Sequence, residues 1–122
     1  MAEEAVVVID GERFAVGPEA PLVFGRSNAP GVIGLDPSDM GISAEAGAVE
    51  RQWGVWWVVN RSTKRRLLLD VAGQGPPQRL DCGQRYAITV PRMTVLIPGA
   101  VLTHRLDVML PESDLLASRG GG

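Results

Sequence analysis

Short apolar runs alternate with polar positions along the chain, and turn residues separate the runs. Short runs bounded by turn residues, as in residues 5–9, 13–16 and 103–109, are typical of β-strands, and no stretch has a convincing helical period. Asp10-Gly11 lies between the first two runs and predicts a tight hairpin, because glycine adopts positive φ freely. We predict an all-β protein of about ten or eleven short, mostly antiparallel strands, as expected of a sandwich or barrel.

The run at residues 54–59 is apolar on both of its faces. In a strand, Trp56 and Val58 share one face, whereas Val55, Trp57 and Val59 share the other. Such a strand lies centrally in a sandwich or is partly covered by a partner. We expect Trp56 in the core; for Trp57 we favour the core, with a partner surface as the alternative.

Length and composition indicate one globular domain. The chain has 122 residues, of which 45% are hydrophobic and 21% charged. We expect the domain at residues 1–110, with 111–122 as a flexible tail or a linker to a further domain. The first residues lack the basic and long apolar character of a signal peptide, and the apolar runs are too short to span a bilayer. A cytoplasmic location without a membrane partner is the default expectation.

The residues needed for catalysis or metal binding are scarce. His104 is the only histidine, and we expect it at the surface or at a sheet edge. Cys82 is the only cysteine, which excludes an intramolecular disulfide and a multi-cysteine metal site. Asp36 and Asp39 flank Pro-Ser, which indicates turn chemistry more often than calcium binding. The sequence has no G-x-S-x-G motif. We therefore predict no enzyme, no metal and no cofactor.

Four cations are concentrated in a slightly acidic chain. Residues 61–66, between two apolar runs, contain Arg61, Lys64, Arg65 and Arg66, whereas the formal net charge of the chain is −2. A phosphate-binding loop, a nucleic-acid contact and a solvated turn are all consistent with this run. The negative net charge makes nucleic acid an unlikely partner.

Several short motifs occur in a characteristic order along the chain. They are Gly25-Arg26, Ser43 within residues 39–46, Trp56-x-Val58, Asn60-x-Ser62, and Leu80 followed by Gly83. In this order they resemble the forkhead-associated (FHA) domain over roughly residues 5–110. The resemblance implies a β-sandwich that binds phosphothreonine peptides through loops at one end.

The resemblance also implies roles for particular residues. Arg26 would present a planar fork to phosphate oxygens, and Ser43 would add a hydroxyl hydrogen bond. Thr63 corresponds to a turn residue that helps to hold the phosphate. Lys64 and Arg65 would add charge pairing at the same turn. The predicted phosphopeptide-binding residues are therefore Arg26, Ser43, Thr63, Lys64 and Arg65.

The chain departs from the FHA pattern at three places. Ala46 stands at the position of a histidine that braces the loops, and Ala44 at one that often carries Arg or Asn. Lys64-Arg65 replaces an Asn-Gly pair whose asparagine bonds the peptide backbone, and lysine cannot accept a hydrogen bond.

Three hypotheses for function follow, in this order. The first is a non-catalytic interaction module that recognises phosphothreonine-containing or acidic partner segments. The second is a degenerate FHA fold that serves as a structural or oligomerisation module of a larger regulatory protein. That hypothesis predicts that Trp57 or an edge strand forms a contact surface, as in a homo-oligomer. The third, nucleic-acid binding through residues 61–66, ranks last.

Overall fold

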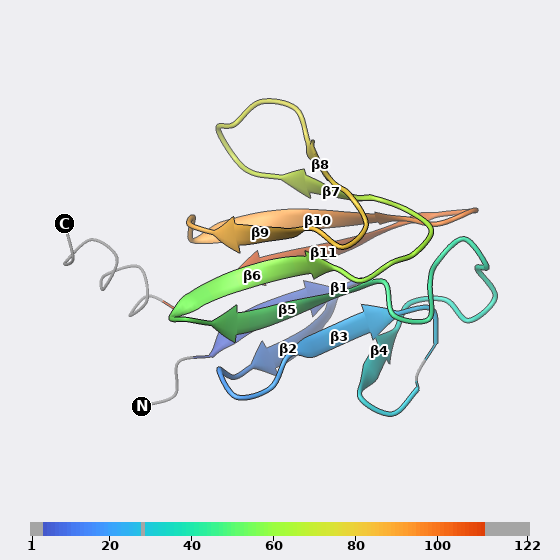
Figure 1. Cartoon of the computed structure of the whole chain (residues 1–122), viewed down its shortest axis with the longest axis horizontal. Coiled ribbons are helices and arrows are strands. Elements are labelled where there is room, and N and C mark those ends of the chain that lie inside the picture. The colour runs from blue at the N-terminus through green and yellow to red at the C-terminus, as the bar shows by residue number, and fades with distance from the viewer. Residues whose placement is uncertain (1–3, 28, 112–122) are drawn as a thin grey trace.

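Two β-sheets pack face to face in the computed structural model, which describes residues 4–27 and 29–111. The first sheet, sheet A, contains in spatial order β2 (Glu12–Val16), β1 (Ala5–Ile9), β11 (Thr103–Met109), β10 (Arg92–Pro98), β7 (Leu67–Asp70) and β8 (Gln78–Leu80). The second, sheet B, contains β4 (Val32–Gly34), β3 (Leu22–Gly25), β5 (Gly47–Gln52), β6 (Val55–Asn60) and β9 (Arg85–Ile88). The pair β3–β4 is parallel, and the other pairs are antiparallel. The predicted all-β sandwich is confirmed (Figure 1).

Alternating side chains from both sheets form one core. In β10, Met93, Val95 and Ile97 are buried and point toward sheet B, as the period of two requires. Trp56 and Phe24 are the largest fully buried side chains on the other side of the core. The expected position of Trp56 in the core is therefore confirmed.

Trp57 lies outside the core, so the position favoured for it from the sequence is wrong. Its side chain is on the outer face of sheet B, where it is only partly buried. The physical reason is the pleat, because Trp56 already fills the inward position and its neighbour must point to the opposite face. The alternative for Trp57, a surface that contacts a partner, stays a prediction.

Two tight turns of the same kind form the hairpins β1–β2 and β5–β6. Asp10 and Gly11 have φ of 47° and 89°, which confirms the predicted Asp-Gly hairpin. Trp53 and Gly54 have φ of 54° and 74°, so the second hairpin places a bulky tryptophan in the left-handed region. Side chains other than Gly, Asn and Asp are uncommon there.

His104 is buried, and its predicted surface or edge position is wrong. It lies on β11, which is hydrogen-bonded to strands on both sides within sheet A. Its Nδ1 lies 2.8 Å from a carboxylate oxygen of Asp10, in the β1–β2 turn. The pairing of β11 between β1 and β10 joins distant parts of the chain, and local sequence carries no signal for it.

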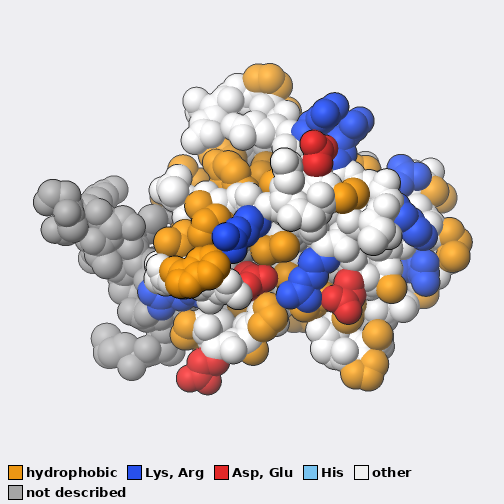
Figure 2. Space-filling view, viewed as in Figure 1, with side chains coloured by type: hydrophobic (Ala, Val, Ile, Leu, Met, Phe, Trp, Pro, Cys, Tyr) orange, Lys and Arg blue, Asp and Glu red, His pale blue; other side chains and the backbone are white. Residues whose placement is uncertain are grey.

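The antiparallel order brings five loops to one end of the sandwich, hereafter the loop end (right in Figure 1). These loops join β1 to β2, β4 to β5, β6 to β7, β8 to β9 and β10 to β11. The connection from β3 to β4 begins at this end with Arg26 and crosses to the other end, because the two strands are parallel. The basic run at residues 61–66 forms the β6–β7 loop. Figure 2 shows that Lys and Arg side chains gather over this end.

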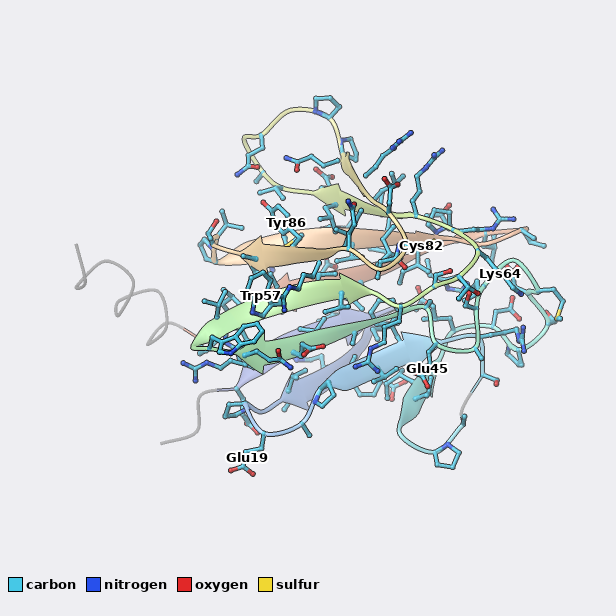
Figure 3. The ribbon with its side chains drawn as sticks, viewed as in Figure 1. Glu19, Glu45, Trp57, Lys64, Cys82 and Tyr86 are labelled. Carbon is cyan, nitrogen blue, oxygen red and sulfur yellow. The ribbon has the colours of Figure 1, made fainter. Side chains whose placement is uncertain are left out.

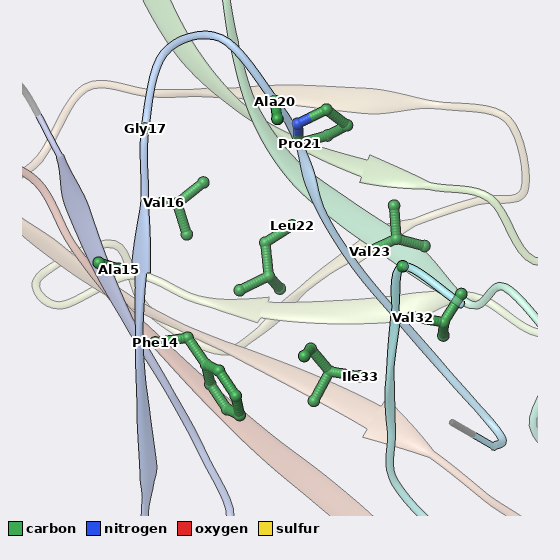
Figure 4. Close-up of a pocket in the computed structure, with 11 residues that line it drawn as sticks. Phe14, Ala15, Val16, Gly17, Ala20, Pro21, Leu22, Val23, Val32 and Ile33 are labelled. Atoms are coloured by element: carbon green, nitrogen blue, oxygen red, sulfur yellow. The ribbon is translucent and has the colours of Figure 1, made fainter. Parts of the chain in front are cut away.

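An apolar groove of about 410 Å³ opens along one side of the sandwich, between the edge strand β2 of sheet A and the β3–β4 pair of sheet B (Figure 4). Its walls include Phe14, Leu22, Val32 and Ile33. None of the described residues that line it carries a charge, so it is unsuited to a phosphate.

Two further predictions from the sequence are that no segment spans a membrane and that residues 111–122 form a tail or linker. The described residues contain no helix that is long and apolar enough to cross a membrane. Of the tail predicted at residues 111–122, all but Pro111 lies outside the described residues.

Candidate functional site

Arg26 is positioned by a close backbone contact at the end of β3. A Cβ atom on Gly25 would overlap the carbonyl oxygen of Ala44, so only glycine permits this approach. The Arg26 N–H donates to the carbonyl of Ser43 over 3.0 Å, and this bond fixes Arg26 beside Ser43. The Arg26 side chain is half-buried and makes no hydrogen bond or ion pair with any described residue.

The Ser62 hydroxyl organises the β6–β7 loop from inside. Its oxygen accepts hydrogen bonds from the backbone N–H groups of Lys64 (3.0 Å) and Arg65 (3.1 Å). It also lies 2.8 Å from the hydroxyl oxygen of Ser43. Because two N–H groups already occupy the lone pairs of Ser62, its own hydrogen is the one donated to Ser43.

This arrangement leaves the Ser43 hydroxyl hydrogen available. The Ser43 oxygen accepts from Ser62 and, over 3.4 Å, from the backbone N–H of Thr63. Within residues 4–27 and 29–111, no other hydrogen-bond acceptor is in range of the Ser43 hydroxyl. Ser43 is 7% exposed, whereas Thr63 is exposed. Arg26, Ser43 and Thr63 are therefore connected through one short series of hydrogen bonds, and we call them the Arg26 cluster.

Asn60 holds the base of the same loop. Its side-chain amide donates to the carbonyls of Arg65 (3.2 Å) and Leu80 (2.8 Å), and its oxygen accepts from the Ser62 N–H (2.8 Å). The side chain is 1% exposed. These bonds pair the buried side-chain amide of Asn60 with three backbone groups, so Asn60 links the β6–β7 loop to β8.

Lys64 and Arg65 connect the loop to its neighbours. Lys64 Nζ donates to the carbonyl of Met40 (2.9 Å) in the β4–β5 loop. Arg65 Nη1 donates to the carbonyl of Gly99 (3.4 Å) in the β10–β11 loop. Both of these predicted site residues thus have structural partners, and each keeps further N–H groups.

Asp39 joins the β4–β5 and β10–β11 loops. Its carboxylate accepts from the backbone N–H groups of Gly41 (2.9 Å), Ala100 (2.8 Å) and Val101 (3.4 Å). The bond from Ala100 is the largest cause that lowers the pKa of Asp39, and the charge of Arg65 adds to the effect. The interpretation of Asp39 as a turn residue is confirmed.

The bracing function that the resemblance assigns to a histidine has other sources here. Ala46, at that position, is buried and connects two elements through its backbone: its N–H donates to Phe24, and its carbonyl accepts from Arg61. Together with Asp39 and Asn60, these bonds fix the loops without an imidazole.

The remaining cations of the basic run differ from each other. Arg61 pairs with Glu45 (3.2 Å) and Glu50 (3.7 Å) along the surface of sheet B. Arg66 is exposed and has no partner among the residues that the structure describes. The solvated-turn interpretation therefore describes Arg66 and, in part, Arg61.

The five predicted residues separate into two groups. Arg26, Ser43 and Thr63 lie together, whereas Lys64 and Arg65 point their charges toward the β4–β5 and β10–β11 loops. The structural roles of Asn60 and Ser62 were not predicted, although both residues belong to the Asn60-x-Ser62 motif. Their burial is the missing information, and burial depends on the tertiary structure.

Comparison with known proteins identifies the fold. No protein-family model matches the sequence, and no curated protein matches it. Among solved structures, the FHA domain of an Arabidopsis thaliana hypothetical protein matches with a TM-score of 0.67 at 16% identity, over 89% of this chain and 86% of that chain. An engineered FHA domain with a Myc-pTBD peptide matches with a TM-score of 0.68 at 10% identity, over 96% and 98%. The FHA domain of human APLF, in complex with an XRCC1 bisphospho peptide, matches with a TM-score of 0.61 at 15% identity, over 84% and 96%.

The chain therefore has the fold of FHA domains, and the expectation from the motifs is confirmed. Sequence identities of this size establish the fold alone. The function has to be argued from this chain's own residues.

Proposed function

We propose that this protein is a non-catalytic interaction module that binds phosphothreonine-containing or acidic partner segments at the loop end. The observation that carries the proposal is the unused hydroxyl hydrogen of Ser43, whose carbonyl accepts from the backbone N–H of Arg26. The Arg26 side chain itself has no partner among the described residues. A solved FHA domain that shares the fold, that of human APLF, was determined with a bisphospho peptide.

The chemistry of the Arg26 cluster fits a phosphate group. The guanidinium of Arg26 presents parallel N–H groups to two phosphate oxygens, and the Ser43 hydroxyl donates to one oxygen. The exposed hydroxyl of Thr63 supplies a further donor at the rim. Lys64 and Arg65, fixed by one hydrogen bond each, raise the positive potential beside the cluster.

Removing Arg26 tests this proposal. In fluorescence anisotropy titrations with a phosphothreonine peptide library, we expect Arg26→Ala to weaken binding about tenfold or more, the equivalent of one charge-assisted interaction. Arg13→Ala, which removes an exposed arginine from edge strand β2, is the matched control and should bind like the wild type. Absence of binding to any peptide, or equal binding by Arg26→Ala, would refute phosphate recognition.

A second candidate function is self-association through the outer face of sheet B. Trp53 is 74% exposed, and its ring lies edge-on to that of Trp57 with 6.3 Å between centroids. The Arg85 guanidinium lies 4.9 Å from the Trp53 ring and 4.6 Å from the Trp57 ring. Tryptophan and arginine are the residues most enriched in the energetic centres of protein interfaces.

Folding stability alone gives little reason for Trp53. Its left-handed backbone costs about 1 to 2 kcal/mol. The contacts with Trp57 and Arg85 return a similar amount, about 1 to 2 kcal/mol in total. The backbone cost of Trp53 and the gain from its contacts nearly cancel. An exposed tryptophan that adds so little to folding stability fits a contact surface for a second copy of the chain.

Replacing Trp53 separates its effect on folding stability from its effect on self-association. We expect the free energy of unfolding of Trp53→Asn to lie within about 1 kcal/mol of that of the wild type, because asparagine tolerates the left-handed turn. In sedimentation velocity, the wild type should show concentration-dependent self-association that Trp53→Asn reduces. A wild type that stays strictly monomeric at high concentration would contradict this second function.

A further inference from the structure

A cavity of about 670 Å³ lies on the sheet A side of the β6–β7 loop. Three consecutive cations, Lys64, Arg65 and Arg66, line one wall. Its size falls within the range of ligand-binding clefts in proteins. Figure 3 shows Lys64 and Cys82 beside the β6–β7 loop, where this cavity opens.

The cavity is separate from the Arg26 cluster. Arg26, Ser43 and Thr63 are not among its lining residues. Lys64-Arg65, at the position of the Asn-Gly pair, lines this cavity together with Arg66, whereas Arg61 pairs with Glu45 and Glu50 along the surface of sheet B.

The cavity is positively charged on balance and retains unused donors. Among the described residues that line it, Asp81 is the only one with a negative charge, against three cations. Arg66 is exposed and forms no hydrogen bond or ion pair within the described residues, so its whole guanidinium is available. Lys64 and Arg65 spend one side-chain N–H each on backbone carbonyls.

The rest of the lining fits a peptide side chain better than a nucleic acid. Leu68 and Pro98 supply apolar surface for the aliphatic part of a side chain, and Thr103 supplies a hydroxyl. A nucleic acid would need a basic surface of greater extent, and the whole chain has a formal net charge of −2.

We propose that this cavity is a second anion site, which binds a carboxylate or phosphate group of a peptide segment through Arg66, Lys64 and Arg65. The inference that the partner is a peptide rests on the proposed function; the anion site itself does not require the Arg26 cluster. A peptide segment with two anionic groups would bind the Arg26 cluster and this cavity at once, and the second contact would increase its avidity.

Cys82 provides a direct reporter for this site. It is the only cysteine of the chain, its thiol is exposed, and it lines the cavity with its Sγ 3.6 Å from the carbonyl of Arg65. We would follow its alkylation by neutral iodoacetamide on the full chain, alone and with a tetraglutamate peptide, inorganic phosphate or a single-stranded oligothymidylate.

Protection of Cys82 by the tetraglutamate peptide, by phosphate or by both is the expected result, and the comparison identifies which anion the site prefers. Arg66→Gln should weaken the protecting interaction about tenfold, as expected for one lost charge-assisted contact. Arg13→Gln, on the far edge of sheet A, is the matched control, and its Cys82 should be protected by the same anions as in the wild type.

The Arg26→Ala variant keeps this inference distinct from the proposed function. It should lose phosphothreonine binding while Cys82 is still protected by the tetraglutamate peptide or phosphate. Unchanged alkylation of the wild type with both probes would overturn the second site, even if Arg26 proves essential. Protection by the oligothymidylate alone would overturn it too, because the cavity would then belong to a nucleic-acid surface.

Discussion

At the scale of single residues, buried polar side chains do most of the work of shaping the loop end. Asn60 and Ser62 together bond four backbone N–H or carbonyl groups of the β6–β7 loop and one carbonyl of β8. Ser43 is the member of this network whose hydroxyl hydrogen has no acceptor among the described residues. The same hydrogen bonds that fold the turn therefore prepare the candidate binding hydroxyl.

Asn60→Asp tests this network. The substitution keeps the acceptor for the Ser62 N–H but removes both donors, to Arg65 and Leu80, and introduces a carboxylate at a site that is 1% exposed. We expect the free energy of unfolding in urea at neutral pH to fall by about 2 to 4 kcal/mol. Gln84→Glu is the control, because Gln84 is exposed and uses only its oxygen, toward the Asp81 N–H. A similar loss in both variants would contradict the role of Asn60.

At the scale of elements, the loops are held by one another. Asp39 connects the β4–β5 loop to the β10–β11 loop, and Lys64 and Arg65 connect the β6–β7 loop to both. The end of β3 is fastened to residues 43 and 44 by a close approach. Loops fixed in this way present binding groups at a lower entropic cost.

The close approach of β3 makes Gly25→Ala a test at this scale. The added methyl group meets the Ala44 carbonyl, so β3 and the β4–β5 loop must separate. We expect a loss of about 2 kcal/mol or more in chemical denaturation, with shifted amide resonances at Arg26 and Ser43. Gly17→Ala, where nothing lies within 4 Å of the new atom, is the control. Equal stability of the two variants would show that the approach is not a constraint.

At the scale of the whole molecule, electrostatics couple stability to acid. The Ala100 N–H is the largest cause of the lowered pKa of Asp39. In Asp107, burial acts to raise the pKa, but the hydrogen bond from Thr94 and the charge of Arg105 outweigh it, so this pKa is lowered as well. Since both groups bind protons more weakly in the folded state, stability rises with pH across their titration range.

Acid should therefore destabilise the protein, and part of that effect should come from Asp39. Its contribution is present above the pKa of the unfolded chain and is lost as pH falls below about 4. We expect Asp39→Asn to be less stable than the wild type at pH 7 and the difference to shrink on acidification. Urea denaturation at a series of pH values measures this difference. Glu19→Gln, in the β2–β3 loop, should track the wild type. A pH-independent deficit in Asp39→Asn would contradict the assignment.

Local pattern predicted much of the fold. Short apolar runs separated by turn residues identified the strands, and Asp10-Gly11 marked the first hairpin. The order of short motifs indicated the FHA sandwich. Predictions failed where a residue's surroundings come from distant segments: His104 is buried because β11 pairs between β1 and β10, and Trp57 is outside because sheet A covers only one face of β6.

The sequence by itself determined the β architecture, the residues at the turns and the position of the basic run between two strands, because these follow from local backbone preference and side-chain alternation. Only the tertiary structure decided which way the cations of that run point. Residues 26, 43 and 63 meet because three loops converge, whereas Lys64 and Arg65 turn toward Met40 and Gly99 and line a separate cavity with Arg66. Side-chain direction depends on partners that are distant in sequence, and no local pattern records them.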